Sequence, residues 1–379
     1  MFKEVTIFSY GDSNDLSTWS NVPFFLAEAL ENKNIKLNRV NVIPNRLVRV
    51  LWNKVVLSIL RLFFKDTTYT FERTPFFRFL VNIKMWRTVK KFNNTDIFIA
   101  ISFSFHPKKF TNKPVVMFCD WTYDYYFDYF KKREPDILER QEIKNQYALQ
   151  KSVDAMFVLF PDVCTYVKEK GICKNVFYLG NVVNSKRYFL TVDTIKKKYN
   201  NNEIIFIGSS KYLPGLKILV SVFLRLSDSF PSSKLNIIGI TKKELKVNDE
   251  RINFLGYLNK SNEHENSIYY DSVNKAKVFV NTTPEWASFS AALDVMYHFT
   301  PVITSQYRSF QETFGNSINF GLYSSNDKDE LEEKLNEILG ENFDSYKKRC
   351  LNARNAVEPF SWDTYVKKML SVTSSVIKN

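Results

Sequence analysis

The sequence predicts an α/β protein with two Rossmann-like domains, each a parallel sheet covered by helices. Three observations support this fold class. The chain has 379 residues, which is more than one hydrophobic core usually supports. Its hydrophobic content of 45% is ordinary for a globular protein and too high for a disordered one. Short apolar runs alternate with helical stretches along the chain, a pattern typical of parallel sheets with crossover helices.

The first half of the chain carries six strand-like runs, rich in β-branched and aromatic residues and separated by helical or polar segments. They are VTIFSY (5–10), LNRVNVI (37–43), DIFIAIS (96–102), PVVMFC (114–119), AMFVLF (155–160) and NVFYLG (175–180).

A second series of strands begins after Asn184. It comprises IIFIGS (204–209), LNIIGI (235–240), INFLGY (252–257), KVFVNT (277–282) and PVITS (301–305). The two series predict an N-terminal domain at residues 1–184 and a C-terminal domain at 185–358, joined near NVVNSKRYF (181–189).

Two long helices are predicted besides the crossover helices. Residues 131–151 form a charged stretch of helical composition, and residues 359–377 have apolar side chains near helical spacing. We expect the segment 359–379 to pack back on the N-terminal domain.

The positive charge of the chain is concentrated in one segment. The whole sequence has 53 basic and 40 acidic residues, a net charge of +13. Residues 46–92 contain eleven Lys or Arg and only Asp66 and Glu72 as acids, so they carry nine of these thirteen charges. This charge favours polyanionic partners such as nucleic acid, anionic lipid or phosphorylated small molecules.

The same segment mixes its charges with Leu, Phe and Trp. Central charges make it unsuited to spanning a membrane. Basic helices with apolar faces suit the surface of an anionic leaflet, where each Lys or Arg contributes about 1 kcal/mol. The alternative is that these helices pack on the sheet while their basic ends reach water. No helix-turn-helix, RNP or zinc-finger pattern supports nucleic-acid binding. We therefore expect contact with an anionic membrane surface through residues 46–92, and no nucleic-acid partner.

The cysteines and the N-terminus indicate the compartment. Cys119, Cys164, Cys173 and Cys350 are scattered and form no C-x-x-C pair, which argues against a disulfide framework or a zinc ribbon. The first residues, MFKEVTIFSYG, read as a strand and a turn rather than a secretory signal. We expect a cytoplasmic protein, peripheral on the inner face of the membrane. Three dispersed histidines and no clustered carboxylates predict no metal site.

The most informative stretch lies between Asn274 and Gly315. A strand ends in a polar turn, small residues open a helix, and Asp294 lies about two turns into that helix. Free N–H groups at a helix N-terminus can hold phosphate, and a carboxylate can accept hydrogen bonds from ribose hydroxyls. The alternative is a helix capped by Ser288 or Ser290 with a solvated carboxylate.

The order P-E-x(3)-F-S-x(3)-D-x-M followed by T-P-V-I resembles the nucleotide-sugar-binding region of family 4 (group 1) glycosyltransferases. The strand and basic loop IIFIGSSKYLPGLK precede it in the family's order, and the resemblance covers about residues 175–360. It implies the GT-B fold, with two Rossmann-like domains facing each other across a cleft, and no cofactor, because the nucleotide-sugar is a substrate. The implied donor-binding residues are Gly208, Ser210, Lys211, Lys217, Glu285, Ser288, Ser290 and Asp294.

Two positions depart from the family pattern. Asp294 replaces the second glutamate of the E-x7-E pair, which places Trp286 at the first position and Glu285 one residue earlier. The usual Arg and Lys of the diphosphate clamp are missing, and Lys211 and Lys217 are the nearby replacements. These departures leave open a donor with another phosphate arrangement, such as a nucleoside monophosphate sugar.

The N-terminal half offers candidates for the acceptor and the chemistry. The resemblance implies that the loop with Gly11, Asp12 and Ser17 faces the acceptor, although it also reads as an ordinary strand-to-helix turn. Asp120 directly follows a strand and would act as a base or stabilise an oxocarbenium-like charge, or else caps its loop. His106 ends a strand-like run and is the second catalytic candidate, with a structural role as its alternative.

Together these features predict a glycosyltransferase that moves a sugar from a nucleotide-activated donor to a growing cell-surface glycan of the lipopolysaccharide, capsule or O-antigen type. The resemblance implies retention of configuration and transfer without a metal. Two alternatives remain: a nucleotide-sugar 2-epimerase, and a non-catalytic GT-B-like partner that binds a glycan or lipid.

Overall fold

The computed structural model describes residues 2–44, 46–185, 192–226 and 229–378. The chain divides into two compact units. The first unit contains residues 1–181 and 362–379, and the second contains residues 182–361. The predicted junction at 181–189 is described only as far as Ser185, so its last four residues lie outside the described residues.

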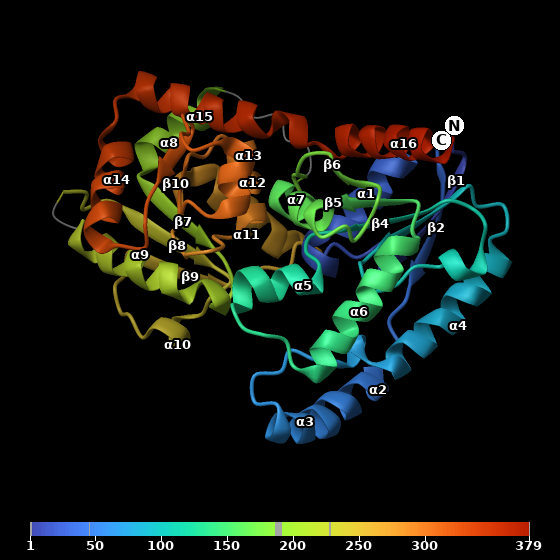
Figure 1. The fold of residues 1–379 in the computed structure, drawn as a ribbon. Coiled ribbons are helices and arrows are strands. Elements are labelled where there is room, and N and C mark those ends of the chain that lie inside the picture. The colour runs from blue at the N-terminus through green and yellow to red at the C-terminus, as the bar shows by residue number, and fades with distance from the viewer. Residues whose placement is uncertain (1, 45, 186–191, 227–228, 379) are drawn as a thin grey trace. The chain divides into compact units, whose positions relative to one another are not determined.

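The first unit contains a six-stranded parallel sheet in the order β2-β1-β3-β4-β5-β6. Figure 1 shows this part of the chain in blue to green. All five residues of β3 are buried, as expected for a central parallel strand with both faces covered. The strands are β1 (Glu4–Ser9), β2 (Lys36–Asn41), β3 (Ile97–Ile101), β4 (Val115–Cys119), β5 (Ala155–Val158) and β6 (Val176–Tyr178).

Helices cover this sheet. Thr74 caps the N-terminus of α4 and accepts a hydrogen bond from the backbone N–H of Phe77, and Pro75 opens the helix. The helices outside the basic segment are η1 (Thr18–Asn21), α1 (Val22–Glu31), η4 (Lys108–Phe110), α5 (Tyr123–Tyr125), η5 (Tyr126–Lys131), α6 (Ile137–Ser152), α7 (Pro161–Glu169) and α16 (Trp362–Lys378).

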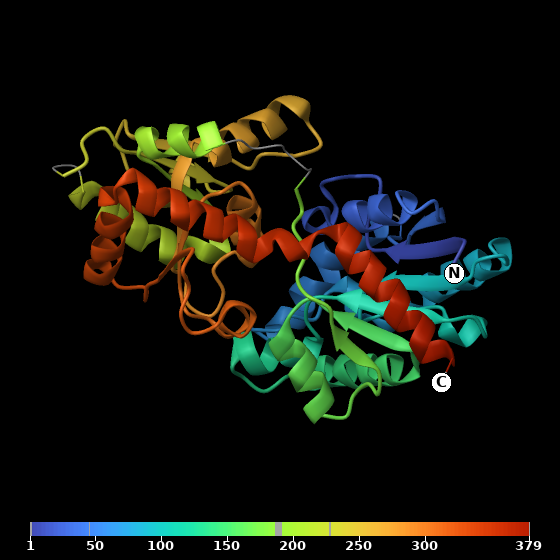
Figure 2. The ribbon, with the colours of Figure 1, turned by 90° about the horizontal axis from the view of Figure 1, so that it is seen from above.

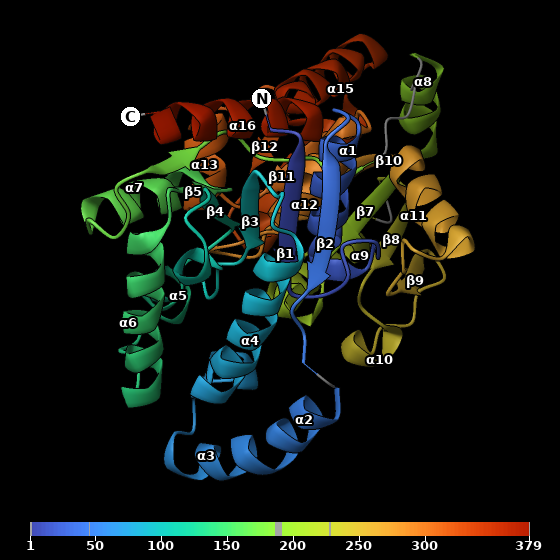
Figure 3. The ribbon, with the colours of Figure 1, turned by 90° about the vertical axis from the view of Figure 1, so that its right-hand side faces the viewer.

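The segment 46–92 is mainly helical, as the sequence predicts. It forms α2 (Arg46–Leu51), the π-helical turn η2 (Trp52–Val56), α3 (Leu57–Phe63), the short η3 (Phe71–Arg73) and α4 (Pro75–Lys91). Because α2 follows the end of β2 after a few residues, α2 and α3 lie beyond the carboxyl ends of the strands (Figure 3).

The predicted helix at 131–151 begins later than expected. Residues 126–131 form the π-helical turn η5, and α6 starts only at Ile137. The reason is local, because Pro135 precedes Asp136, whose side chain caps α6 in a reciprocal capping box with Glu139.

The C-terminal helix α16 belongs to the first unit. It contacts α1 and β5, and the rings of Trp362 and Tyr365 pack on Phe118 of β4 at centroid distances of 6.0 and 5.5 Å. In Figure 2 this helix runs diagonally across the strands of the first unit. The first unit is therefore assembled from two separate pieces of the sequence.

The second unit contains another six-stranded parallel sheet, in the order β12-β11-β10-β7-β8-β9. The predicted α/β fold with two Rossmann-like sheets is confirmed. Its strands are β7 (Glu203–Ile207), β8 (Lys234–Ile238), β9 (Ile252–Gly256), β10 (Ala276–Asn281), β11 (Val302–Thr304) and β12 (Gly321–Tyr323). The sequence analysis did not predict β12.

The order of these strands reverses between β7 and β10, and ligands of such sheets bind outside the carboxyl ends at this point. The first sheet has the corresponding reversal between β1 and β3. Helices of the second unit are α8 (Val192–Asn201), η6 (Ser210–Tyr212), α9 (Leu213–Arg225), α10 (Lys242–Leu245), α11 (Glu263–Lys275), α12 (Phe289–Tyr297), α13 (Arg308–Phe314), α14 (Lys328–Gly340), α15 (Phe343–Val357) and η7 (Glu358–Phe360).

Across the part of the chain that the structure describes, no helix has the length and apolar character that crossing a membrane requires.

Candidate functional site

Glycines let the loops of the second unit approach one another at the reversal point. Gly208 directly follows β7, and Gly239 follows β8 with φ of +94°. A Cβ atom on Gly239 would lie 2.4 Å from the carbonyl oxygen of Gly208, closer than real Cβ contacts. Only glycine fits at Gly239, because both the backbone angle and the contact exclude a side chain.

The N-terminus of α9 is held against the loop after β10. A Cβ atom on Gly215 would lie 2.5 Å from Oγ1 and 2.6 Å from N of Thr283. The Thr283 hydroxyl donates a hydrogen bond to the carbonyl of Tyr212 (3.2 Å). The first turn of α9 therefore lies beside this loop. It continues directly from η6, so the N–H of Leu213 already donates to the carbonyl of Ser210, and Pro214 has no N–H to offer.

The loop after β10, residues 281–288, is fixed by buried polar side chains. Asn281 donates from Nδ2 to Oγ of Ser288 (3.0 Å), and its Oδ1 accepts from the N–H of Thr283 (3.1 Å). Ser305 donates to the carbonyl of Thr283 (2.7 Å). Glu285 and Ser288 have φ of 60° and 53°, so two non-glycine residues adopt the left-handed region here. Such strain persists where the surrounding structure imposes it, and it concentrates at functional sites.

The structure brings only two of the eight predicted donor residues into one close contact. Gly208 and the buried Ser288 meet at the reversal point, since a Cβ atom on Gly208 would lie 3.1 Å from Oγ of Ser288. Five further candidates are exposed at the surface of the second unit: Ser210, Lys211, Lys217, Glu285 and Ser290. Ser210 donates to Glu244 (2.6 Å) and Lys211 lies over the ring of Tyr212 at 4.7 Å. Lys217, Glu285 and Ser290 are exposed, the first on α9 and the last in the first turn of α12.

Asp294 is buried in a charged cluster between α11 and α12. Its Oδ2 accepts from Nζ of Lys260 (2.8 Å) and from the hydroxyl of Tyr269 (2.7 Å). Burial raises the pKa of this carboxyl, but the charge of Lys260 and the hydrogen bonds outweigh burial and hold the pKa below its ordinary value. Oδ1 of Asp294 is buried and has no hydrogen-bond partner within the described part of the chain.

His298 stands next to this cluster. Its Nδ1 is 2.9 Å from Oδ1 of Asn274, and its Nε2 is 3.0 Å from Oγ of Ser185. Burial lowers the pKa of His298 to about 4, so the imidazole is neutral near neutral pH. Lys260 was not among the predicted residues, and its only signal in the sequence is its position in the loop that follows β9.

The loop after β1 contains the predicted acceptor residues. Gly11 has φ of +113°, and a Cβ atom there would lie 2.6 Å from Cγ2 of Thr18. Oδ1 of Asp12 accepts from the backbone N–H and the amide of Asn14, both at 2.9 Å. The backbone N–H of Ser17 bonds to Asp15 (2.8 Å).

The same loop ends in a strained stretch that the sequence analysis did not predict. Trp19, Ser20 and Asn21 have φ of 36°, 53° and 70°, three consecutive left-handed residues immediately before α1. Left-handed backbone is usually marked by glycine in the sequence. None of these three residues is a glycine, so the sequence gives no signal for this conformation.

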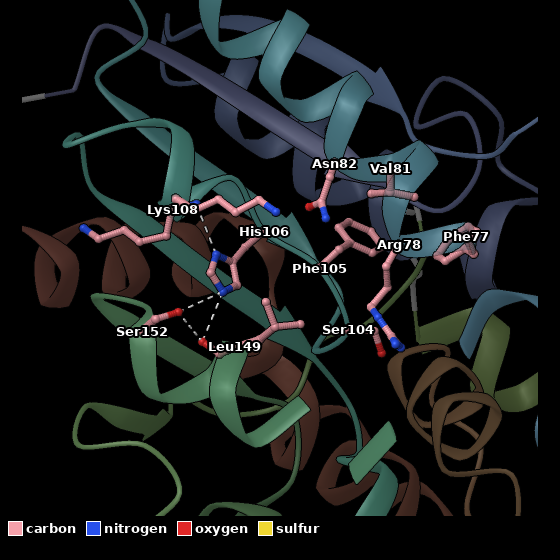
Figure 4. A pocket seen from close by; sticks show the side chains of 11 residues that line it. Phe77, Arg78, Val81, Asn82, Ser104, Phe105, His106, Lys108, Leu149 and Ser152 are labelled. Atoms are coloured by element: carbon pink, nitrogen blue, oxygen red, sulfur yellow. Dashed lines mark hydrogen bonds between the residues drawn. The ribbon is translucent and has the colours of Figure 1, made fainter. Parts of the chain in front are cut away.

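His106 lines a cavity of about 250 Å³ in the first unit (Figure 4). Its Nδ1 accepts from the backbone N–H of Lys108 (3.2 Å), and its Nε2 lies 3.1 Å from the carbonyl of Leu149 and 3.2 Å from Oγ of Ser152. Burial lowers the pKa of His106 to about 4. Both ring nitrogens are therefore engaged by the protein, as a histidine with a structural role would be.

Asp120 follows β4 at the carboxyl edge of the first sheet and is half-buried. Its Oδ1 accepts from the backbone N–H of Trp121 (2.8 Å) and from the thiol of Cys119 (3.2 Å). Among the residues that the structure describes, no group of three or more His, Cys, Asp and Glu side chains is arranged to hold a metal ion.

Residues 191–356 match the family model of glycosyl transferases group 1. The second unit is a group 1 glycosyltransferase domain. The glycosyltransferase activity expected from the sequence is thereby confirmed, and the match covers both the loop after β7 and the strained loop after β10.

Solved structures resemble this chain at low identity over nearly its whole length. Sucrose-phosphate synthase from Thermosynechococcus elongatus is 14% identical, covers 99% of each chain and has a TM-score of 0.71. HepE from Anabaena, solved with UDP and glucose, is 12% identical over 99% of this chain and 100% of its own, with a TM-score of 0.62. The lipopolysaccharide outer core galactosyltransferase WaaB is 14% identical over 98% and 99%, with a TM-score of 0.59.

At these identities the likeness shows the fold alone, which is GT-B. A comparison with curated protein sequences gives no significant match.

Proposed function

We propose that this glycosyltransferase takes a sugar from a nucleotide-activated donor and adds it to a lipid-linked, growing cell-surface glycan. The observation that carries the proposal is the set of loops at the reversal point of the second sheet, inside the matched group 1 domain. HepE was solved with UDP and WaaB acts on lipopolysaccharide, and both share this fold.

The donor phosphates would lie between the N-termini of α9 and α12. Gly215 in the first turn of α9 is next to Thr283, and Ser288 and Ser290 stand at the start of α12. Lys211 and Lys217 would add positive charge from η6 and α9. Negative charge develops on the departing phosphate, and fixed N–H groups and ammonium groups stabilise such charge in the transition state.

Asp294 and Glu285 would bind the ribose and the sugar. Among the residues that the structure describes, one buried oxygen of Asp294 has no hydrogen-bond partner, so it has the capacity to accept a further hydrogen bond. Family resemblance supports transfer with retention of configuration and without a metal. Gly11, Asp12 and Ser17 would face the acceptor from the loop after β1.

The exposure of apolar side chains supports the proposed contact with a membrane surface. Five apolar side chains along α2, η2 and α3 are 48 to 77% exposed: Leu51, Val55, Ile59, Leu62 and Phe63. On α4 the exposed apolar residues are Phe76, Phe79 and Trp86. Apolar side chains beside many basic residues favour binding at an anionic leaflet, and we place the protein on the cytoplasmic face of the membrane.

A thermal-shift panel of UMP, UDP, GDP, ADP, CMP and dTDP tests the donor site. A ligand at 100 times its Kd stabilises the native state by about 2.7 kcal/mol, which raises the unfolding midpoint. We expect one base to give a clear shift, and a response to CMP alone would fit the missing diphosphate clamp. Lack of a shift with every nucleotide would favour a non-catalytic, glycan- or lipid-binding partner.

The products separate transfer from epimerisation. With the matching nucleotide-sugar and a lipid-linked acceptor, we expect the free nucleotide and an extended glycan. A 2-epimerase would instead return the nucleotide-sugar with an inverted carbon, and that product would overturn the proposal.

Asp120 is the stronger of the two proposed catalytic residues, because both ring nitrogens of His106 are engaged within the first unit. General acid–base groups contribute about 10²- to 10⁴-fold to rate. We expect Asp120→Asn to lower kcat at least 100-fold without changing the nucleotide-induced thermal shift. His106→Gln is the comparison, and full activity of Asp120→Asn would remove Asp120 from the mechanism.

A further inference from the structure

A large cationic pocket opens beyond the carboxyl ends of the first sheet, between α3 and η5. Its volume is about 800 Å³. Five basic side chains line it against a single acid, Asp66. The basic residues are Arg61, Lys65, Arg73, Lys131 and Arg133. Three of these residues belong to the basic segment 46–92, and the fold places Lys131 and Arg133 of another segment beside them.

The two arginines at the floor of the pocket are held in place. Arg133 pairs with the buried Glu139 at 2.8 and 2.9 Å and donates to the carbonyl of Asp66 (2.6 Å). Arg73 donates to the carbonyl of Thr68 (2.6 Å) and stacks over the ring of Tyr123 at 3.8 Å. Glu139 neutralises Arg133, whereas Arg73 has no ion-pair partner among the described residues.

The three basic side chains at the mouth of the pocket also have no ion-pair partner among the described residues. Arg61, Lys65 and Lys131 are exposed, and Lys131 lies 5.9 Å from the ring of Tyr126. Within the described ranges, Arg61 and Lys65 have no hydrogen bond or ion pair from their side chains. Several unpaired positive charges that converge on one pocket favour an anionic ligand.

An apolar edge borders the pocket. Leu62 and Phe63, between Arg61 and Lys65 in the sequence, are 75% and 77% exposed. The exposed residues Leu51, Val55 and Ile59 precede them at helical spacing. The apolar edge would contribute nothing to the binding of a soluble anion. A lipid, in contrast, has a charged headgroup next to an apolar layer.

The pocket's helices are tied to the candidate acceptor loop. Arg49 of α2 donates to the hydroxyl of Tyr10 (3.4 Å), and this hydroxyl donates to Glu72 of η3. Tyr10 directly precedes Gly11. A lipid bound at α3 would therefore sit on helices that contact the loop proposed to hold the acceptor.

We propose that this pocket binds the phosphate of an anionic lipid headgroup, while Leu62 and Phe63 enter the apolar layer of the same leaflet. The proposal rests on the membrane contact in the proposed function and deepens it by naming the site and the ligand class.

The test measures binding to vesicles of phosphatidylcholine mixed with phosphatidylglycerol. The pocket variant is Arg61→Gln/Lys65→Gln/Lys131→Gln. The matched control, Lys144→Gln/Lys151→Gln/Lys174→Gln, removes three exposed charges elsewhere on the first unit. At about fivefold for each cation near an anionic surface, we expect the pocket variant to lose about a hundredfold in partitioning. The control should lose less than threefold, and all six side chains are exposed, so both variants should fold.

Two results would overturn the proposal. Equal losses in both variants would mean that the vesicle senses overall charge and not this pocket. Unchanged vesicle binding by the pocket variant, with stabilisation of the wild type alone by glycerol 3-phosphate, would assign the pocket to a soluble phosphate. The nucleotide-induced thermal shift is recorded on the same samples. Its absence from the wild type counts against the proposed donor site and leaves the vesicle result to decide the lipid question.

Discussion

Single glycines determine how closely the segments at the carboxyl edge of the second sheet approach one another. Gly215 is a clear case, because α9 would otherwise be an ordinary helix start after Pro214. The missing side chain lets the first turn of α9 contact Thr283 directly. The close contact between α9 and the loop after β10 therefore depends on Gly215 having no Cβ atom.

Gly215→Ala should destabilise the second unit. The new methyl group would lie 2.5 Å from Oγ1 of Thr283, and overpacking of this kind costs about 1 to 3 kcal/mol. We expect a lower unfolding midpoint and a weaker nucleotide-induced shift. Gly340→Ala at the end of α14 is the control, because nothing lies within 4 Å of its Cβ position. Equal midpoints for the two variants would show that the α9 contact is not tight.

The buried histidines should make stability fall in acid. Burial lowers the pKa of His298 to about 4, so between about pH 6.5 and 4 the unfolded chain binds a proton that the folded chain does not. Stability from this group is therefore full above pH 6.5 and is lost as the pH falls, by roughly 1.4 kcal/mol per pH unit.

Unfolding midpoints recorded from about pH 7 to about pH 5 test this effect. His298→Gln should reduce the decline, while His264→Gln, which replaces an exposed histidine, should leave it as in the wild type. An identical decline in all three proteins would mean that other groups cause the acid sensitivity.

At the scale of elements, strand positions follow from sequence more reliably than boundaries and irregular helices. Eleven of the twelve strands in the described ranges lie within the runs expected from β-branched and aromatic content, give or take a residue. The exception, β12, has three residues and begins with Gly321, so it lacks the usual composition signal. The π-helical turns η2 and η5 have no sequence signature, and η5 ends at Lys131, where the charged helix was expected to begin.

The candidate site was predictable only in part. Resemblance pointed to Gly208 and Ser288, and the structure brings these two residues together. Lys260 and the stretch Trp19–Asn21 escaped prediction for different reasons. Lys260 pairs with Asp294 across 34 residues of sequence, and a left-handed backbone without glycine leaves no trace in composition.

The apolar stripe of α3 should determine membrane binding as much as its charge. Burying one Leu or Phe side chain contributes about 1.5 to 3 kcal/mol, so Leu62→Ser/Phe63→Ser should lower vesicle partitioning at least tenfold. Ile137→Ser/Ile377→Ser is the control, since it replaces exposed apolar residues of α6 and α16. Cosedimentation with anionic vesicles measures the partitioning of both variants. Equal binding by the two variants would show that α3 does not take part in the membrane contact.

At the scale of the whole molecule, α16 makes the first unit depend on the last residues of the chain. Removing residues 362–379 would expose Phe118 and the other apolar side chains that Trp362 and Tyr365 cover. We expect limited proteolysis of the truncated protein to digest the first unit and to leave a fragment close to residues 182–361. Equal resistance of the first unit in both proteins would show that α16 is dispensable for its folding.

This arrangement also sets the timing of folding during synthesis. The strands of the first sheet leave the ribosome first, but their covering helix follows only after the 180 residues of the second unit. At about 5 to 20 residues per second, that delay is roughly 10 to 40 seconds. During that time, an aromatic surface around Phe118 is exposed to water or to a chaperone. The same surface is buried in the finished protein.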